Sequence, residues 1–250
     1  MSKTLGAAGF CYNAVSQDYC FKETIACMND FADSFAIVDA GSTDGTASVL
    51  QDLQNSYPKM KLLCLPNSAW VQQKGREKLS YFSNIAFDML DTDYFISLQM
   101  DEILHELCYE SVRKAIETGQ EAFLVSRINL WRDCNSQLEV PQNRKPVSTE
   151  IIRLAKKGYY SYDDAESLRA QCVIDFVNDI RIYHYGFVRK KEVHPDKVRH
   201  MLGEVFLMDV DKKLNGMEVF DPYAWFNDED LIPIKEPHPK VMQEWIKTRP

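Results

Sequence analysis

The feature that most constrains this chain is the alternation of short apolar runs with amphipathic segments over its first hundred residues. The apolar runs are residues 5–12, 34–40, 60–65 and 94–98. Segments with a helical spacing of apolar residues lie between them, at 18–31, 44–55 and 74–90. Such alternation is typical of a parallel sheet that is covered on both faces. The sequence therefore predicts an α/β fold with a Rossmann-like, mainly parallel sheet and helices on both faces.

The second half of the chain is less regular. We expect strands at 122–130, 151–155 and 172–185, helices at 106–118 and 191–205, and a loop over 132–149. The length suits one α/β domain with an appendage. We predict a domain over residues 1–205 and a C-terminal extension over 206–250 that packs on it. In the extension, His238 and Trp245 either close over a substrate or pack the extension onto the core.

Charge and cysteine content narrow the class of protein. The formal net charge is −8, whereas a general nucleic-acid binder has a basic surface, so a nucleic-acid partner is disfavoured. The seven cysteines include no CxxC pair, which argues against a disulfide framework or a cysteine zinc site. No apolar run approaches the ~18 residues that span a bilayer, and the N-terminus lacks a signal-peptide pattern. We expect a cytoplasmic protein with no transmembrane segment.

The motif DAGSTDGT, residues 39–46, follows the second apolar run. Gly41 and Gly45 permit tight turns, and the polar residues between them, Asp44 included, are good helix N-caps. Asp39 at the strand end can accept hydrogen bonds from a nucleobase or a ribose. An ordinary strand–turn–helix corner explains the same residues equally well.

Two adjacent acids, Asp101 and Glu102, follow the fourth apolar run, after Gln99 and Met100. A divalent cation prefers carboxylate and diphosphate oxygens together, so an acid at a strand end can bridge metal and phosphate. The alternative is a solvated helix start, because helix N-termini favour acids.

A third candidate region is the end of the strand over 172–185. His184 lies there, and a run of cations follows it: Arg189, Lys190, Lys191, Lys197 and Arg199. In an acidic protein such a strip can offset the charge of a diphosphate. A lone histidine is more often structural, and a run of cations is often a solvated helix face.

Taken together, these motifs resemble the family 2 glycosyltransferases of the GT-A fold, including bacterial and phage members. The match covers residues 5–104. It comprises an Asn after the first strand (Asn13), the motif at 39–46, the pattern Arg76, Asn84, Ala86, and the strand end at 98–102. One departure is Gln99, which stands where the family has the first acid of its metal motif.

The resemblance implies the activity and the site. The chain would be a hexosyltransferase that moves a sugar from a nucleotide-diphosphate sugar to the hydroxyl of a saccharide or other acceptor, with inversion. Asp101 and His184 would bind Mn²⁺ or Mg²⁺. The nucleotide would be bound by Asn13, Asp39, Asp44, Arg76, Arg189 and Lys191. The base that deprotonates the acceptor would come from the acidic segment 159–167, with Glu166 preferred, then Asp164, and Asp163 as a further candidate.

Two other functions remain open at this stage. A nucleotidyltransferase that makes the activated sugar would share the fold, but such enzymes carry a glycine-rich basic loop after the first strand, and residues 11–20 contain none. A non-catalytic nucleotide-sugar-binding protein is favoured by the replacement at Gln99.

Overall fold

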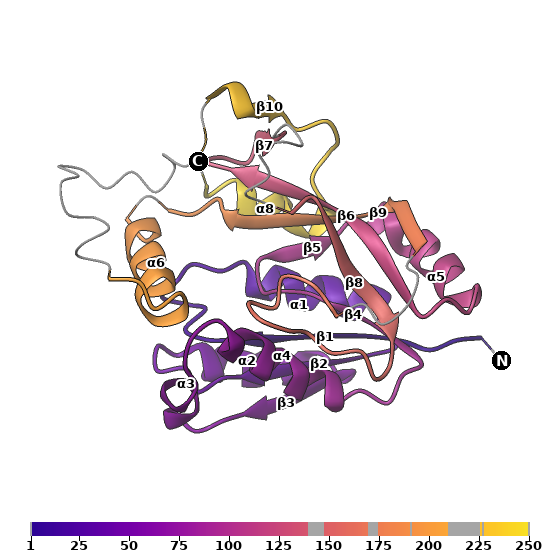
Figure 1. Cartoon of the computed structure of the whole chain (residues 1–250), viewed down its shortest axis with the longest axis horizontal. Coiled ribbons are helices and arrows are strands. Elements are labelled where there is room, and N and C mark those ends of the chain that lie inside the picture. The colour runs from indigo at the N-terminus through magenta and orange to yellow at the C-terminus, as the bar shows by residue number, and fades with distance from the viewer. Residues whose placement is uncertain are drawn as a thin grey trace.

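The computed structural model describes residues 2–139, 148–169, 175–190, 192–209, 226 and 228–249 (Figure 1). The strands are β1 (Leu5–Cys11), β2 (Ser34–Asp39), β3 (Met60–Cys64), β4 (Tyr94–Ser97), β5 (Glu102–Leu104), β6 (Ala122–Trp131), β7 (Ser136–Leu138), β8 (Glu150–Lys156), β9 (Asp175–Phe187) and β10 (Leu231–Pro233). The α-helices are α1 (Phe21–Phe31), α2 (Thr46–Ser56), α3 (Ser68–Gln72), α4 (Glu77–Asp88), α5 (Tyr109–Glu117), α6 (His194–His200) and α8 (Gln243–Ile246). The alternation predicted for the first hundred residues is confirmed.

The sheet is parallel in its N-terminal half and mixed beyond it. Its strand order runs β3-β2-β1-β4-β8-β6, then to β7 and β10, while β9 pairs with β6 and β5. β1, β2, β3 and β4 are mutually parallel neighbours, and β8 runs antiparallel to both β4 and β6. The predicted α/β class with a mainly parallel central sheet is therefore confirmed.

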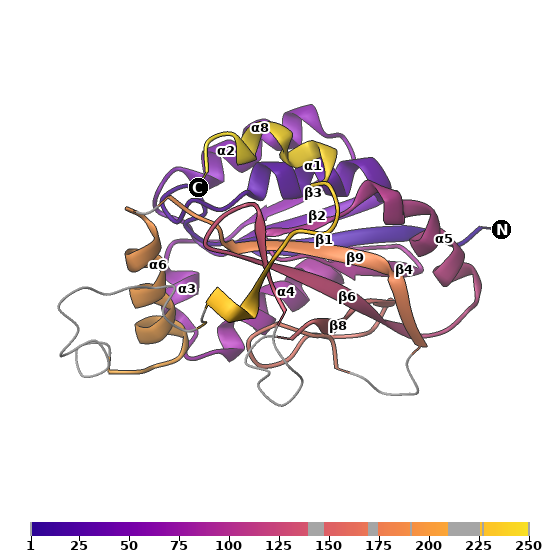
Figure 2. The ribbon, with the colours of Figure 1, turned by 90° about the horizontal axis from the view of Figure 1, so that it is seen from above.

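Helices cover both faces of the sheet, as Figure 2 shows for α1 and α2 on one side and α3 and α4 on the other. Successive residues of a strand point to opposite faces. Accordingly Leu5 and Ala7 pack in the cluster that includes α1 and α5, whereas Ala8 packs in the cluster that includes α4. Because both faces are buried, the central strands must be apolar throughout, which is why the sequence shows them as continuous runs.

The pairing of β9 brings the site residues together. β9 lies between β5 and β6, and this register sets His184 beside both Glu102 and Asn129. The sequence did not predict β5, β7, β10 or α3, because three to five residues are too few to show a periodicity. The expectation of a loop throughout 132–149 was wrong at β7; residues 140–147 lie outside the described residues.

The described part of the C-terminal tail contacts the back of β9. The Tyr185 hydroxyl lies 2.8 Å from His238 Nδ1, and the ring of Trp245 packs edge-on against Tyr185 at 5.6 Å. The division into domains 1–205 and 206–250 stays a prediction. Among the described residues, no helix is both long enough and apolar enough to cross a membrane.

Candidate functional site

A cavity of about 440 Å³ opens at the carboxyl ends of β1 and β4. This is the edge of a parallel sheet where ligands usually bind. Its walls come from segments far apart in the chain. The residues that line it include Tyr12 just after β1, Gln99 and Asp101 after β4, Arg127 of β6, Asp164 and Glu166, His184 of β9, and Lys197 and His200 of α6.

Asp101 is the centre of a buried charged cluster. Arg189 Nη2 donates to Asp101 Oδ2 at 3.1 Å, and Lys197 Nζ lies 3.7 Å from the same oxygen. The other oxygen, Oδ1, lies 3.7 Å from His184 Nε2. Burial opposes ionisation of Asp101, but the cations Lys197 and Arg189 beside it outweigh burial and hold the pKa of this carboxyl below its ordinary value. We call Asp101, His184, Arg189 and Lys197 the Asp101 cluster.

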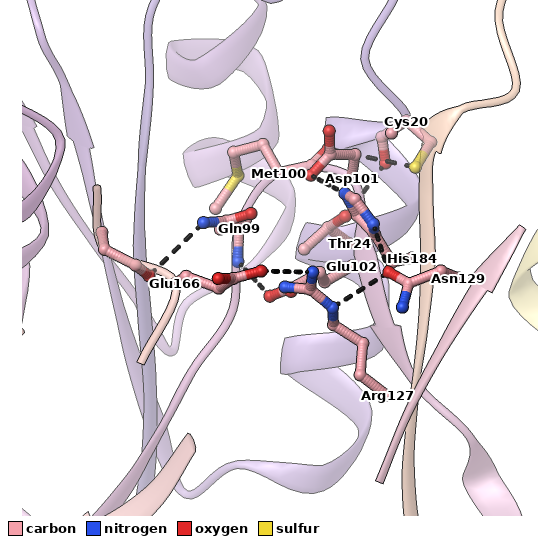
Figure 3. A network of polar contacts seen from close by, with 12 residues as sticks. Cys20, Thr24, Gln99, Met100, Asp101, Glu102, Arg127, Asn129, Glu166 and His184 are labelled. Carbon is pink, nitrogen blue, oxygen red and sulfur yellow. Dashed lines mark hydrogen bonds and ion pairs between the residues drawn. The ribbon is translucent and has the colours of Figure 1, made fainter. Parts of the chain in front are cut away.

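The tautomer of His184 follows from its neighbours, drawn in Figure 3. Asn129 Oδ1 accepts from Arg127 Nε at 3.0 Å, and Asn129 Nδ2 donates to Ser148 O, so the orientation of this amide is determined. Oδ1 of Asn129 faces His184 Nδ1 at 3.0 Å, which assigns the proton to Nδ1. Burial lowers the pKa of His184 well below its ordinary value, so the ring is neutral. Its Nε2 lone pair therefore points at Asp101 Oδ1.

A carboxylate oxygen and an imidazole lone pair that face each other fit a divalent cation. The hydrogen bond from His184 Nδ1 is the support that metal-binding histidines usually have. Gly186 leaves the room, because a Cβ there would lie 2.3 Å from His184 Nε2 and 2.9 Å from Asp101 Oδ2. Within the described residues no group of three metal-ligating side chains occurs, so a cation here would complete its coordination with phosphate or water oxygens.

Glu102 has a different role from its neighbour Asp101. It is fully buried; Arg153 Nη2 donates to its Oε1 at 2.8 Å, and Arg127 Nη1 lies 3.6 Å from the same oxygen. The backbone N–H of Gln99 donates to its other oxygen at 2.9 Å. The solvated helix start considered for this acid pair is therefore wrong: both acids are buried, and Glu102 holds the turn in place.

The two acids preferred as the catalytic base both line the cavity, but their surroundings differ. Arg127 Nη2 donates to Glu166 Oε1 at 2.7 Å, and Ser148 Oγ donates to Glu166 Oε2. Among the described residues, no cation forms an ion pair with Asp164. Burial raises the pKa of Asp164, and the nearby Glu166 and Asp163 raise it further.

The corner after β2 lies beside the cavity without lining it. Asp39 accepts hydrogen bonds from the N–H and hydroxyl of Ser42, and the same hydroxyl accepts from Asn13 N at 2.8 Å. Asn13 Oδ1 accepts in turn from Thr43 N. Burial raises the pKa of Asp39 despite the bonds from Ser42. The structure thus places Asp39 and Asn13 in a network that joins two loops.

Asp44 belongs to the same network. It accepts from Ser16 N at 2.7 Å and from the N–H and hydroxyl of Thr46. Burial alone would raise the pKa of Asp44, but these hydrogen bonds outweigh it and lower the pKa.

The cations predicted to bind the nucleotide are dispersed. Arg76 is half-exposed and pairs with Asp163 at 3.1 Å, outside the cavity wall. Arg189 is 1% exposed and lies behind Asp101, where its guanidinium also donates to Gly186 O and Gln17 O. Lys191 lies outside the described residues. Among the described members of the predicted strip, Lys197 is the one that lines the cavity. Burial, reinforced by Arg189, lowers its pKa to about 7.

An aromatic wall was not recognised in the sequence as part of the site. Tyr12 stacks on Trp70 with ring centres 3.9 Å apart and an angle of 7°. His200 lies 5.8 Å from both rings, and Trp70 Nε1 donates to Glu204 Oε2 at 2.9 Å. Tyr12 follows β1, Trp70 lies in α3 and His200 ends α6, so no local pattern links them. Trp70 lies in a helix of five residues, which is too short for a periodicity to mark it in the sequence.

The sequence matches no protein-family model and no curated protein sequence. Similar solved structures are crystal structures of S. aureus TarS. Residues 1–349 with UDP-GlcNAc give a TM-score of 0.49 at 12% identity, covering 87% of this chain and 68% of that one. Residues 1–349 alone give 0.47 at 14% identity, covering 80% and 66%. A further TarS structure gives 0.47 at 15% identity, covering 80% and 40%.

This chain therefore spans less than two thirds of the length of two of these three structures. Membership of family 2 stays a prediction.

Proposed function

We propose that this chain is a glycosyltransferase that moves a sugar from a nucleoside-diphosphate sugar to an acceptor hydroxyl. The observation that carries the proposal is the composition of one cavity. It is lined by the Asp101–His184 pair and Lys197, which suit a diphosphate, and by Asp164, a carboxylate without a cationic partner among the described residues. Diphosphate binding and proton removal are the two tasks that such a transfer needs.

The Asp101 cluster is the proposed diphosphate end of the site. Asp101 Oδ1 and His184 Nε2 would hold Mn²⁺ or Mg²⁺, which supplies Lewis-acid stabilisation of the leaving diphosphate when bound. Arg189 keeps Asp101 ionised and oriented. Gln99, which replaces the first acid of the family motif, is no ligand in this arrangement; its amide nitrogen donates to Ala165 O at 3.4 Å.

The proposed base is Asp164, in place of the Glu166 preferred from the sequence. The ion pair with Arg127 restrains Glu166 and occupies one of its oxygens, whereas Asp164 has no such ion pair among the described residues and its raised pKa suits a proton acceptor. Asp164 takes the proton of the acceptor hydroxyl while that oxygen bonds to the anomeric carbon. The bond from that carbon to the diphosphate breaks on the opposite side, and the nucleoside diphosphate leaves with the electron pair. The sugar is transferred with inversion.

The nucleotide would extend from the diphosphate end along Tyr12 at the end of β1. In this arrangement Asn13, Asp39 and Asp44 act by holding the two loops that shape this wall, through the hydrogen bonds described above. Arg76 pairs with Asp163 outside the cavity wall, and this pair has no role at the nucleotide in the proposed arrangement.

The experiment that tests the function is a donor and acceptor screen. UDP-, GDP-, CDP- and dTDP-sugars are incubated with Mn²⁺ and a panel of saccharide acceptors, and the released nucleoside diphosphate and the glycosylated product are measured. We expect release that depends on acceptor. Nucleotide-sugar binding without turnover would contradict the proposal in favour of a binding protein, and product formed from a nucleoside triphosphate and a sugar phosphate would favour a nucleotidyltransferase.

The base assignment is tested by Asp164→Asn with Asp163→Asn as matched control. We expect Asp164→Asn to lower kcat by about 10²–10⁴-fold while donor affinity is retained. Asp163→Asn removes an adjacent carboxylate that pairs with Arg76 outside the cavity wall, and kcat should stay near that of the unmodified protein. A kcat that falls in Glu166→Gln and not in Asp164→Asn would restore the original assignment.

A further inference from the structure

Three of the cations around Asp101 and the acids next to it, namely Arg127, Arg189 and Lys197, differ in how many donors they have left. Arg127 is held by Glu166, Glu102 and Asn129. Arg189 donates to Asp101, Gly186 and Gln17, and its guanidinium stacks on the ring of Tyr19 at 4.1 Å. Both guanidinium groups are therefore committed to the protein itself.

Lys197 is bound more loosely. In its protonated form the side chain has three N–H donors. One donates to Gly186 O at 3.0 Å, and Asp101 Oδ2 lies at 3.7 Å, beyond hydrogen-bond distance. The contacts given by the described residues thus leave donors of Lys197 available, and its side chain lines the cavity with 12% exposure.

The position of Lys197 relative to Asp101 indicates what these donors are for. Asp101 faces two cations through Oδ2 and offers Oδ1, with His184 Nε2, on the other side. An anion that reaches Lys197 would therefore lie beside Asp101 without displacing the pair that fits a metal ion. The walls around Lys197 are the rings of Tyr19 and Phe187, at 5.2 and 5.7 Å, which limit the access of water and strengthen an ionic contact.

We propose that Lys197 binds the diphosphate of the donor directly, so that a nucleoside diphosphate keeps measurable affinity when divalent cations are removed. The inference rests on the proposed function, because it assumes that the cavity takes a nucleotide. It adds a residue of α6 to the binding site and a binding mode that does not require metal. A lysine acts here as a point charge that the phosphate oxygens share.

The test is calorimetry of UDP, GDP, CDP and dTDP, and of the matching monophosphates, in EDTA and in Mn²⁺. In EDTA we expect the unmodified protein to bind a diphosphate more tightly than its monophosphate. Lys197→Gln should lose about 10- to 100-fold in diphosphate affinity and little in monophosphate affinity. Lys197→Arg should retain most of the preference. A merely structural role of Lys197 would weaken both nucleotides equally.

The control is Arg199→Gln on the same helix. Arg199 is 54% exposed and pairs with Asp196, so its loss should leave the diphosphate preference unchanged. Equal affinities of Lys197→Gln and the unmodified protein for the diphosphate in EDTA would overturn the inference and leave the proposed function standing. An unmodified protein that binds diphosphate only with Mn²⁺ would also overturn it. Failure of every nucleotide to bind in both buffers would instead contradict the proposed function, and the inference with it.

Discussion

The corner after β2 and the corner after β4 each hold a buried aspartate, Asp39 and Asp101, but the surroundings of the two carboxylates are opposite in kind. Asp39 is satisfied by neutral donors of its own turn, the N–H and hydroxyl of Ser42. Asp101 is compensated by Arg189 and Lys197, which come from the far half of the chain. Burial raises the pKa of Asp39, whereas the cations hold the pKa of Asp101 below its ordinary value.

The difference shows that the surroundings of an acid at a strand end determine whether it braces a loop or remains available to a ligand. A carboxylate surrounded by donors of its own loop acts as a brace, and it has little capacity left for a ligand. A carboxylate whose partners are distant charges stays ionised at a cavity wall, and one of its oxygens can serve another group. The predictions below test this contrast, from the largest expected effect to the smallest.

The largest effect is expected for Asp101→Asn. The substitution keeps the shape of the side chain but leaves Arg189 and Lys197 without their counterion. Removal of one member of a buried ion pair costs about 3–5 kcal/mol, and loss of the diphosphate site should lower turnover by about 10²–10³-fold. Urea unfolding and release of nucleoside diphosphate measure the two effects. Asp196→Asn, which removes an exposed carboxylate from α6, is the control. Unchanged stability in Asp101→Asn would abolish the contrast.

Two glycines give the second test: Gly186 of β9, which lies against Asp101, and Gly45 of the corner after β2. In Gly186→Ala the new Cβ would lie 2.3 Å from His184 Nε2 and 2.9 Å from Asp101 Oδ2, so the facing pair of side chains must shift. We expect the affinity for Mn²⁺ with nucleoside diphosphate to fall by about 10–100-fold, measured by calorimetry. In Gly45→Ala the Cβ enters open space at a φ of +92°, so the cost should be about 1–2 kcal/mol of backbone strain with Mn²⁺ affinity unchanged. Equal Mn²⁺ affinity in both variants would argue against a metal ion at His184.

The smallest effect is expected for Asp39→Asn, and it should depend on pH. Because the folded-state pKa of Asp39 is raised, its favourable contribution is complete below the unfolded pKa and is lost as pH rises through the folded pKa. The amide that replaces the carboxyl would not titrate and would still offer Ser42 an acceptor. The free energy of unfolding of the variant relative to the unmodified protein should therefore increase with pH, and the substitution should cost at most about 1.5 kcal/mol.

The same variant decides whether Asp39 touches the nucleotide. Nucleotide affinity should be unchanged in Asp39→Asn if the carboxylate only braces the loop. A large loss of affinity with normal stability would show that Asp39 contacts the base, as the family resemblance implies, and would make the two corners alike. Urea unfolding at several pH values and calorimetry with nucleoside diphosphates cover both outcomes.

Much of the fold could be predicted because its signals are local. Strands buried on both faces must be apolar along their whole length, and helices that pack on them must be amphipathic, so β1, β2, β4 and the helices between them are visible in the residues alone. The order of the motifs also brought Asp101, His184, Asp164 and Glu166 forward as candidates, and all four line the same cavity.

What the sequence by itself determined is the alternation of strand and helix and the presence of acids where strands end. Only the tertiary structure decided which acid serves which purpose. The pairing of β9 with β5 and β6 sets His184 beside Asp101. Arg127 forms an ion pair with Glu166, and α6 places Lys197 near Asp101. The physical reason is that the ionisation and availability of a carboxylate depend on charges and burial within a few ångströms, and folding draws those neighbours from distant parts of the chain.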